Sequence, residues 1–377
     1  MSSESIRLSR SIVGQAEAEA VARVIIDDGY LGMGREVEAF ETEIAGFLGV
    51  PRDWVICVST GTAALQLALE AVVEPGDKVL VQSLTYLASF QAVSGARAVP
   101  IACEVDPRNV TIDLDDAAGR MSAGTAAVMP VHYASNPGDL KAIYDFARQH
   151  GLRVVEDAAH AFGCTYQGEP IGSIGDLVCF SFDGIKNITS GEGGAVVTRD
   201  PIAAERIRDA RLLGVQKDTE KRYQGLRSWE FDVTRQGWRY HMSNIMAAVG
   251  RVQLRRLKPE FAPKRRELAT LYHERLAGTP HLTLLETDLD EVIPHIQPVR
   301  ILDGRRDGLK AHLEGLGIPT GFHYQPNHLL RLYGGGQVAL PVTEALSREL
   351  VSLPLHPGLN AETVNMICDH AIRWLAD

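Results

Sequence analysis

Short apolar runs recur along residues 54–199, and segments with the hydrophobic spacing of a helix separate them. Because the runs are nearly continuous in apolar residues, we expect strands that are covered on both faces, as in a parallel sheet with crossover helices. The runs of this kind are 54–58, 78–82, 98–102, 126–132, 153–157, 177–182 and 195–199. The pattern predicts an α/β domain with a large, mostly parallel, seven-stranded sheet and helices on both of its faces.

The flanking regions differ from this repeating pattern. Residues 16–50 have helical spacing with a glycine-rich break at Gly32 and Gly34, and we expect these helices to pack around the main domain. A long helical segment follows at 244–276, and short strand-like runs mix with helical ones after residue 282. We therefore expect a large domain at 1–250 and a smaller α+β domain at 251–377.

Composition narrows the class of protein. The 377 residues carry a formal net charge of -10, which disfavours nonspecific binding to nucleic acid. No apolar run reaches the roughly 18 residues of a membrane span, and the first residues lack the apolar stretch of a signal peptide, so we expect a cytoplasmic protein without membrane contact. The 5 cysteines include no C-x-x-C pair, which argues against a disulfide framework or a metal site.

The sequence STGTAAL at 59–65 follows directly after the first predicted strand. A helix that begins there would present unpaired backbone N–H groups and a positive dipole end, and the hydroxyls would add donors. This arrangement can bind an anion such as a phosphate. The same residue types are also ordinary helix caps, so both interpretations stay open at this point.

Asp157 ends the predicted strand at 153–157, at the edge where open parallel sheets bind ligands. Its carboxylate could hold a pyridine nitrogen in the protonated form, or it could cap a following helix. His160 comes three residues later, where it could contact a cofactor edge or fill a helix face.

Lys186 gives the most specific signal. It lies in the stretch CFSFDGIKN at 179–187, among apolar and small residues, and GEGG follows at 191–194. Burial would lower the pKa of a lysine and free its amine for imine formation. The alternative is a loop lysine that pairs with Glu192.

Together these motifs resemble the DegT/StrS-like sugar aminotransferases, a branch of the fold-type-I enzymes that use pyridoxal phosphate. The resemblance runs through nearly the whole chain. It covers Phe40-Glu41, GTAAL, Pro75-Gly76-Asp77, Thr85-Tyr86, EDAAHAFG, FSF and KN with GEGG, AAVGRVQL, HYQPNH and LPLHPGL, in this order. It implies the fold of this enzyme class and pyridoxal 5′-phosphate as the cofactor.

The resemblance also implies roles for individual residues. Lys186 would form the Schiff base with the cofactor, and Asp157 would bind the pyridine nitrogen. The remaining implied positions are Gly61, Thr62 and Ser181 at the phosphate, Tyr86 stacked on the ring, His160 near the ring hydroxyl, and His323 and Tyr324 on the substrate side.

One triplet departs from the pattern of the family. Many relatives have Asn-aromatic-Arg where this chain reads Arg239-Tyr240-His241, and in those relatives the triplet reaches the active site of the neighbouring subunit. A guanidinium binds phosphate bidentately, so Arg239 could contact the cofactor across a homodimer interface or grip the diphosphate of a substrate. A structural ion pair is the third interpretation. The variant is similar to members that act on thymidine-diphosphate 4-keto-6-deoxyhexoses.

The resemblance thus implies transfer of an amino group from an amino acid, with L-glutamate as the expected donor, to a nucleotide-linked keto-6-deoxy sugar. We expect dTDP-4-keto-6-deoxyhexose, aminated at C4. A 3-keto sugar and a keto cyclitol are alternative acceptors. A sugar dehydratase of the same fold is a further alternative, although such enzymes replace the lysine with histidine. A noncatalytic binding protein would need neither Lys186 nor Asp157.

Overall fold

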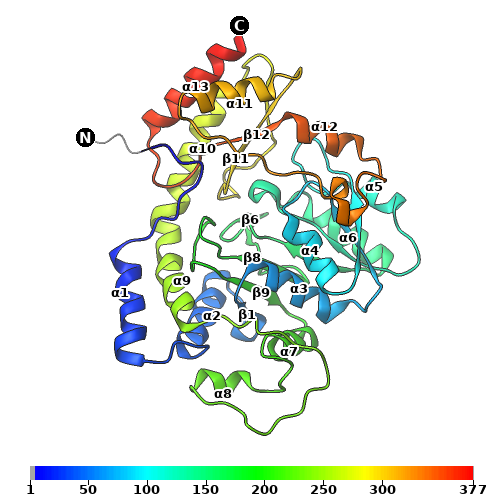
Figure 1. Ribbon diagram of the computed structural model, residues 1–377, viewed down its shortest axis with the longest axis vertical. Coiled ribbons are helices and arrows are strands. Elements are labelled where there is room, and N and C mark those ends of the chain that lie inside the picture. The colour runs from blue at the N-terminus through cyan, green and yellow to red at the C-terminus, as the bar shows by residue number, and fades with distance from the viewer. Residues whose placement is uncertain (1–4, 377) are drawn as a thin grey trace.

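A computed structural model describes residues 5–376 of the chain (Figure 1). Its centre is a seven-stranded sheet with the order β1-β9-β8-β5-β4-β2-β3. The strands are β1 (Val55–Val58), β2 (Lys78–Gln82), β3 (Val99–Cys103), β4 (Thr125–Met129), β5 (Arg153–Asp157), β8 (Leu177–Ser181) and β9 (Gly194–Thr198). Strand β9 pairs antiparallel with both of its neighbours, and the other pairings are parallel. The predicted mostly parallel sheet is confirmed.

The strands are covered on both faces, as their continuous apolar runs require. Along β8, Val178 and Phe180 face one hydrophobic core, and Leu177 and Cys179 face the other. The edge strand β3 differs, since Val99 is exposed and Pro100 removes a backbone donor there. Proline is tolerated at such an edge because its missing N–H faces no partner strand.

Two groups of helices bury these faces. The first core packs beneath α2 (Arg35–Leu48), α6 (Leu140–His150) and α9 (Asn244–Arg256). The second packs beneath α3 (Gly61–Val72), α4 (Leu87–Gly95) and α7 (Pro201–Ala210). Helix α1 (Gln15–Arg23) lies alongside α9, so the N-terminal helices pack on the main sheet domain as expected (Figure 1). The shorter helices α5 (Leu114–Gly119) and α8 (Thr219–Tyr223) complete this part of the chain.

The C-terminal part has its own core around a three-stranded antiparallel sheet. This sheet has the order β10-β11-β12, with β10 (Leu282–Leu284), β11 (Gln297–Ile301) and β12 (Leu350–Leu353). The helices of this part are α10 (Ala262–Leu276), α11 (Arg306–Gly315), α12 (Pro341–Glu349) and α13 (Ala361–Ala376). The expected mixture of strands and helices after residue 282 is confirmed, and the domain boundary near residue 250 stays a prediction.

The C-terminal ends of two neighbouring strands lie at one edge of the large sheet. Strand β5 ends at Asp157 and strand β8 ends at Ser181, and the two strands pair in parallel. Helix α3 begins at Gly61, just after strand β1. Ligands of open α/β sheets bind beyond the carboxyl ends of the strands, so this edge is the place to look for a site. Across residues 5–376, no helix combines the length and the apolar character that crossing a bilayer requires.

Candidate active site

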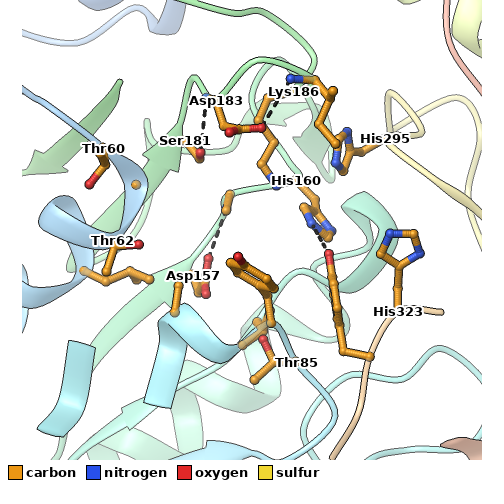
Figure 2. A pocket seen from close by; sticks show the side chains of 18 of the residues that line it. Thr60, Thr62, Thr85, Asp157, His160, Ser181, Asp183, Lys186, His295 and His323 are labelled. Carbon is orange, nitrogen blue, oxygen red and sulfur yellow. Dashed lines mark hydrogen bonds between the residues drawn. The ribbon is translucent and has the colours of Figure 1, made fainter. Parts of the chain in front are cut away.

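A cavity of about 440 Å³ opens at this edge of the sheet. It brings together most of the residues that the sequence had singled out (Figure 2). Those that line it are Gly61, Thr62, Tyr86, Asp157, His160, Ser181, Lys186, His323 and Tyr324. Five loops and element ends far apart in the sequence therefore converge on one space, as the resemblance implied.

The N-terminus of α3 forms one wall of the cavity. Thr60 caps this helix, and its hydroxyl accepts a hydrogen bond from the Ala63 N–H at 3.0 Å. Capping and an open anion cradle are therefore compatible, because the cap uses a single N–H of the first turn. A Cβ added at Gly61 would lie 2.7 Å from the Ser181 Cβ, so the glycine lets the helix end approach the Ser181 hydroxyl closely.

Asp157 lies at the end of β5 and is 5% exposed. Its Oδ2 accepts a hydrogen bond from the Ser89 hydroxyl at 2.7 Å, and its Oδ1 accepts one from the Ala159 N–H at 3.2 Å. Burial raises the pKa of this carboxyl, and the two hydrogen bonds and the nearby Lys186 act in the opposite direction. Residues 158–164 form turns rather than a helix, so the interpretation of Asp157 as a helix cap is wrong, and so is a helix face for His160.

Lys186 faces the cavity from the turn that follows β8 (Figure 2). Burial removes water from the amine and lowers its pKa to about 8. The charges of Asp157 and Asp183 act in the opposite direction. The alternative pairing with Glu192 is not formed, since no ion pair joins these two residues within the described part of the chain. A fraction of the amine is thus neutral near physiological pH.

Three histidines, His160, His295 and His323, line the cavity and lie on one side of it (Figure 2). The rings of His160 and His295 have their centroids 4.4 Å apart, and the Tyr324 hydroxyl lies 3.1 Å from His160 Nε2. His323 Nδ1 lies 2.7 Å from the Ser352 hydroxyl. Burial lowers the pKa of each histidine, that of His323 to about 4, and the charge of Lys186 adds to the effect. At neutral pH the imidazoles are therefore neutral donors and acceptors.

The arrangement matches one family of enzymes. The model of the DegT/DnrJ/EryC1/StrS aminotransferase family covers residues 12–372. This chain belongs to that family. The predicted aminotransferase and its fold are thereby confirmed, and pyridoxal phosphate is the cofactor of such enzymes.

Two relatives that are named for an activity align with almost the whole chain of this aminotransferase. The chain is 35% identical over 371 residues, 97% of its length and 95% of the relative, to a dTDP-4-dehydro-2,3,6-trideoxy-D-glucose 4-aminotransferase of Saccharopolyspora spinosa. It is 36% identical over 367 residues, 96% of its length and 92% of the relative, to a dTDP-3-amino-3,4,6-trideoxy-alpha-D-glucose transaminase of Streptomyces venezuelae. The PLP form of Spr1654 from Streptococcus pneumoniae superimposes with a TM-score of 0.90 at 25% identity, over 99% of both chains.

Arg239 lies outside the cavity of this aminotransferase. Its side chain is exposed, and its backbone bridges to Leu212 in an antiparallel pair. Among the described residues that line the cavity, Lys186 is the single lysine or arginine. The cavity of one chain therefore offers few cationic groups to an anionic substrate.

His295 and Tyr133 are cavity residues that the sequence motifs did not indicate. His295 directly precedes the apolar run of β11, and nothing in the local pattern separates it from a residue at an ordinary strand entry. Tyr133 donates a hydrogen bond from its hydroxyl to the carbonyl oxygen of His323. The contact of Tyr133 with His323 and that of His295 with His160 join distant parts of the sequence, so no local spacing could have indicated them.

Proposed function

We propose that this aminotransferase moves an amino group from L-glutamate to C4 of a dTDP-linked 4-keto-6-deoxyhexose. The observation that carries the proposal is the placement of the Lys186 amine and the Asp157 carboxylate in one cavity, beside the open helix end at Gly61. Support for the acceptor comes from the relative that acts as a 4-aminotransferase on a dTDP-linked dehydro sugar. The second relative, a transaminase named for a 3-amino sugar, keeps amination at C3 as the alternative.

The residues present fit pyridoxal phosphate. The N-terminus of α3 at Gly61 and Thr62, together with the Ser181 hydroxyl, would hold the phosphate, since a Cβ at position 61 would close the gap to Ser181. The buried Asp157 carboxylate would bind the pyridine nitrogen, His160 would lie beside the ring hydroxyl, and the exposed Tyr86 ring would cover the ring face. When bound, the cofactor supplies an aldehyde for the amino group and a pyridinium ring that withdraws electrons.

Lys186 would move the proton. Its Nζ has a pKa of about 8, so a substantial fraction is neutral near pH 7 to 8 and can accept a proton from the α-carbon of the donor. The protonated Nζ would then give that proton to the C4′ carbon of the cofactor in the same half-reaction, so that the proton moves from the donor to the cofactor. For the sugar, the same atom acts in the reverse order and delivers a proton to the carbon that receives nitrogen.

Asp157 and the neutral histidines would set the charge of the site. An ionised Asp157 can keep a proton on the pyridine nitrogen, where electron withdrawal depends on that positive charge. Neutral His160 can exchange a hydrogen bond with the ring hydroxyl of the cofactor, and neutral His323 with sugar hydroxyls, without adding further positive charge near Lys186. Tyr324 and His295 fill space around His160 and would limit the entry of water.

We also propose that the enzyme is a homodimer in which Arg239 of a second copy completes the site. A nucleotide diphosphate and the carboxylates of glutamate need cationic partners, and Lys186 alone cannot supply them. Arg239 is exposed and outside the cavity of its own chain, as a residue that reaches a neighbour would be. The expected cytoplasmic location stays a prediction.

Labelling and product analysis test the proposed chemistry. Incubation with pyridoxal phosphate and then borohydride should add the mass of the reduced cofactor to the peptide that contains Lys186. A Lys217→Ala control, at an exposed lysine, should be labelled like the wild type. With glutamate and dTDP-4-keto-6-deoxyglucose, the product should carry an amino group at C4. Labelling at another lysine would refute the assignment, and loss of a hydroxyl from the sugar would favour the dehydratase.

Mixed dimers test the shared site. Lys186→Ala should be inactive and Arg239→Ala should bind cofactor or substrate weakly, but a mixture of the two should regain activity because one of the two sites then carries both wild-type residues. A mixture of two separately tagged Lys186→Ala preparations is the control. If the Lys186→Ala and Arg239→Ala mixture shows only the activity of the Arg239→Ala dimer, Arg239 acts within its own chain.

A further inference from the structure

A chain of buried hydroxyls leads from the start of α4 to Asp157. Ser89 is 0% exposed, and its Oγ lies 2.7 Å from Asp157 Oδ2. Thr85 is 1% exposed, and its Oγ1 lies 2.9 Å from Ser89 Oγ. Ser89 does not line the cavity, whereas Thr85 and Asp157 do. Ser89 therefore supports the carboxylate from behind rather than touching a bound molecule.

The direction of these hydrogen bonds follows from the number of protons. An ionised carboxylate only accepts, so Ser89 gives its single hydroxyl proton to Asp157. The Tyr86 carbonyl, at 3.3 Å from Ser89 Oγ, is the longer and weaker acceptor. Thr85 must then be the donor to Ser89. Each hydroxyl polarises the next, which strengthens the bond that ends on the carboxylate.

We propose that Ser89 is a positioning residue for Asp157 in transamination and that Thr85 orients Ser89. The inference rests on the proposed contact between Asp157 and the pyridine nitrogen. Ser89 pins Oδ2 with a short, charge-assisted bond, and it leaves Oδ1 with only the longer bond from the Ala159 N–H at 3.2 Å. One oxygen is thus fixed while the other keeps acceptor capacity for a ligand.

The electrostatics of Asp157 support this role. Burial is the largest influence on the carboxyl and raises its pKa, and the hydrogen bond from Ser89 is the largest influence that lowers it. The other titratable groups that act on Asp157 are Lys186, His132, Cys179 and Tyr324. A carboxylate that must keep a pyridine nitrogen protonated has to be ionised itself, and the Ser89 hydroxyl favours that form.

The test compares Ser89→Ala with the rescue variant Ser89→Thr, which keeps the hydroxyl. Ser94→Ala is a matched control, because Ser94 lies on the same helix but its hydroxyl donates to the Phe90 carbonyl oxygen, at 3.1 Å, and not to Asp157. In cofactor-free protein labelled with ¹³C at aspartate carboxyls, Ser89→Ala should raise the pKa of Asp157 by about one to two units, since a hydrogen bond to a charged group contributes roughly 1.5 to 3 kcal/mol. Asp157→Asn assigns the signal.

The holoenzyme gives a second readout. In Ser89→Ala we expect the pH titration of the visible band of bound cofactor to shift and kcat to fall roughly tenfold or more, with the KM for the sugar changed less than about threefold. Ser89→Thr should restore both, and Thr85→Val should shift both in the same direction by less. If Ser89→Ala matches Ser94→Ala in the carboxyl titration, the visible titration and kcat, the positioning role is wrong.

Failure of the proposed function would look different. If Asp157→Asn leaves the visible titration and kcat unchanged, Asp157 does not serve the cofactor, and the role of Ser89 in transamination falls with it. The carboxyl titration of cofactor-free protein would still report whether Ser89 controls Asp157. Should Ser89→Ala not fold, Ser89→Thr and Thr85→Val decide, and an unshifted Thr85→Val titration would overturn the chain of hydroxyls.

Discussion

Two buried groups of charged side chains in this molecule are built in opposite ways. Behind β1, Glu41 and Arg211 are both 0% exposed and form an ion pair of 2.7 Å. Glu41 also accepts two hydrogen bonds, one from the Tyr223 hydroxyl at 2.5 Å and one from the Cys57 N–H at 2.8 Å. In the cavity, by contrast, the Lys186 amine forms no hydrogen bond or ion pair with any described residue.

Charged groups that support the fold and charged groups that serve a reaction need different surroundings. A buried charge that only supports the fold must be paired, because an unpaired charge loses its hydration without compensation. In the Glu41 cluster this pairing favours the charged form and raises the pKa of Arg211. In the cavity burial lowers the pKa of Lys186 and of the histidines, and no ion pair between Lys186 and another described residue offsets it. A base whose pKa lies near the working pH can both accept and return a proton, so Lys186, with a pKa of about 8, is suited to proton transfer.

The largest effect should come from breaking the paired cluster. Glu41→Leu removes the acceptor of Arg211, Tyr223 and Cys57, and it leaves the guanidinium buried without a counter-charge. We expect the free energy of unfolding to fall by about 3 to 5 kcal/mol, measured by urea denaturation with circular dichroism. The double variant Glu41→Leu with Arg211→Leu should recover part of this loss.

A matched control is Glu43→Gln on the same helix, since Glu43 is 30% exposed and pairs with Arg251. This control should change the free energy of unfolding by less than about 1 kcal/mol. If Glu41→Leu costs no more than Glu43→Gln, the buried cluster does not differ from a surface pair, and the contrast with the cavity loses its basis.

Much of the sheet and of the site could be predicted from the sequence, because both depend on local patterns. Continuous apolar runs mark buried strands, and a polar residue at the end of such a run, as at Asp157, lies at the ligand-binding edge of a parallel sheet. Lys186 stood out because a charged residue interrupts an apolar and glycine-rich stretch. Each of these signals is contained within about ten residues of chain.

Other parts of the site depend on contacts between distant residues. Ser89 reaches Asp157 across 68 positions, and in the sequence it is an ordinary serine in the first turn of a helix. His295 meets His160 only because the loop before β11 packs onto the large sheet domain. The proposed contact of Arg239 with a second copy likewise cannot follow from local spacing. Such contacts are set by tertiary packing, which no single stretch encodes.

A smaller effect, of opposite sign, is expected from removing the unpaired cation of the cavity. In cofactor-free protein, Lys186→Met should be more stable than the wild type at pH 7. The pKa of Lys186 falls from 10.5 to about 8 on folding, which corresponds to at most roughly 3 kcal/mol. The amount is smaller where the open cavity keeps the amine partly hydrated.

The difference in stability between Lys186→Met and the wild type should depend on pH. Between pH 8 and 10.5 the unfolded lysine binds a proton that the folded one does not, so the wild type gains stability as the pH rises. The advantage of Lys186→Met should thus be full below pH 8 and vanish above pH 10.5, as followed by urea denaturation. The exposed Lys217→Met should show no such trend. A constant difference across this range would contradict the unpaired state of the amine.

The smallest effect should come from His323→Asn, because asparagine can still hydrogen-bond Ser352 while the titrating ring is lost. The pKa of His323 falls from 6.5 to about 4 in the folded protein, so the folded wild type resists a proton that the unfolded chain accepts. The wild type therefore loses stability as the pH falls from 6.5 towards 4, and the variant should lose roughly 2 kcal/mol less by pH 5. Urea denaturation at pH 7, 6 and 5 measures this difference, with His150→Asn, at an exposed histidine, as the control. If His323→Asn and His150→Asn show the same acid dependence, His323 is hydrated in the folded state, and the cavity does not hold its histidines neutral by exclusion of water.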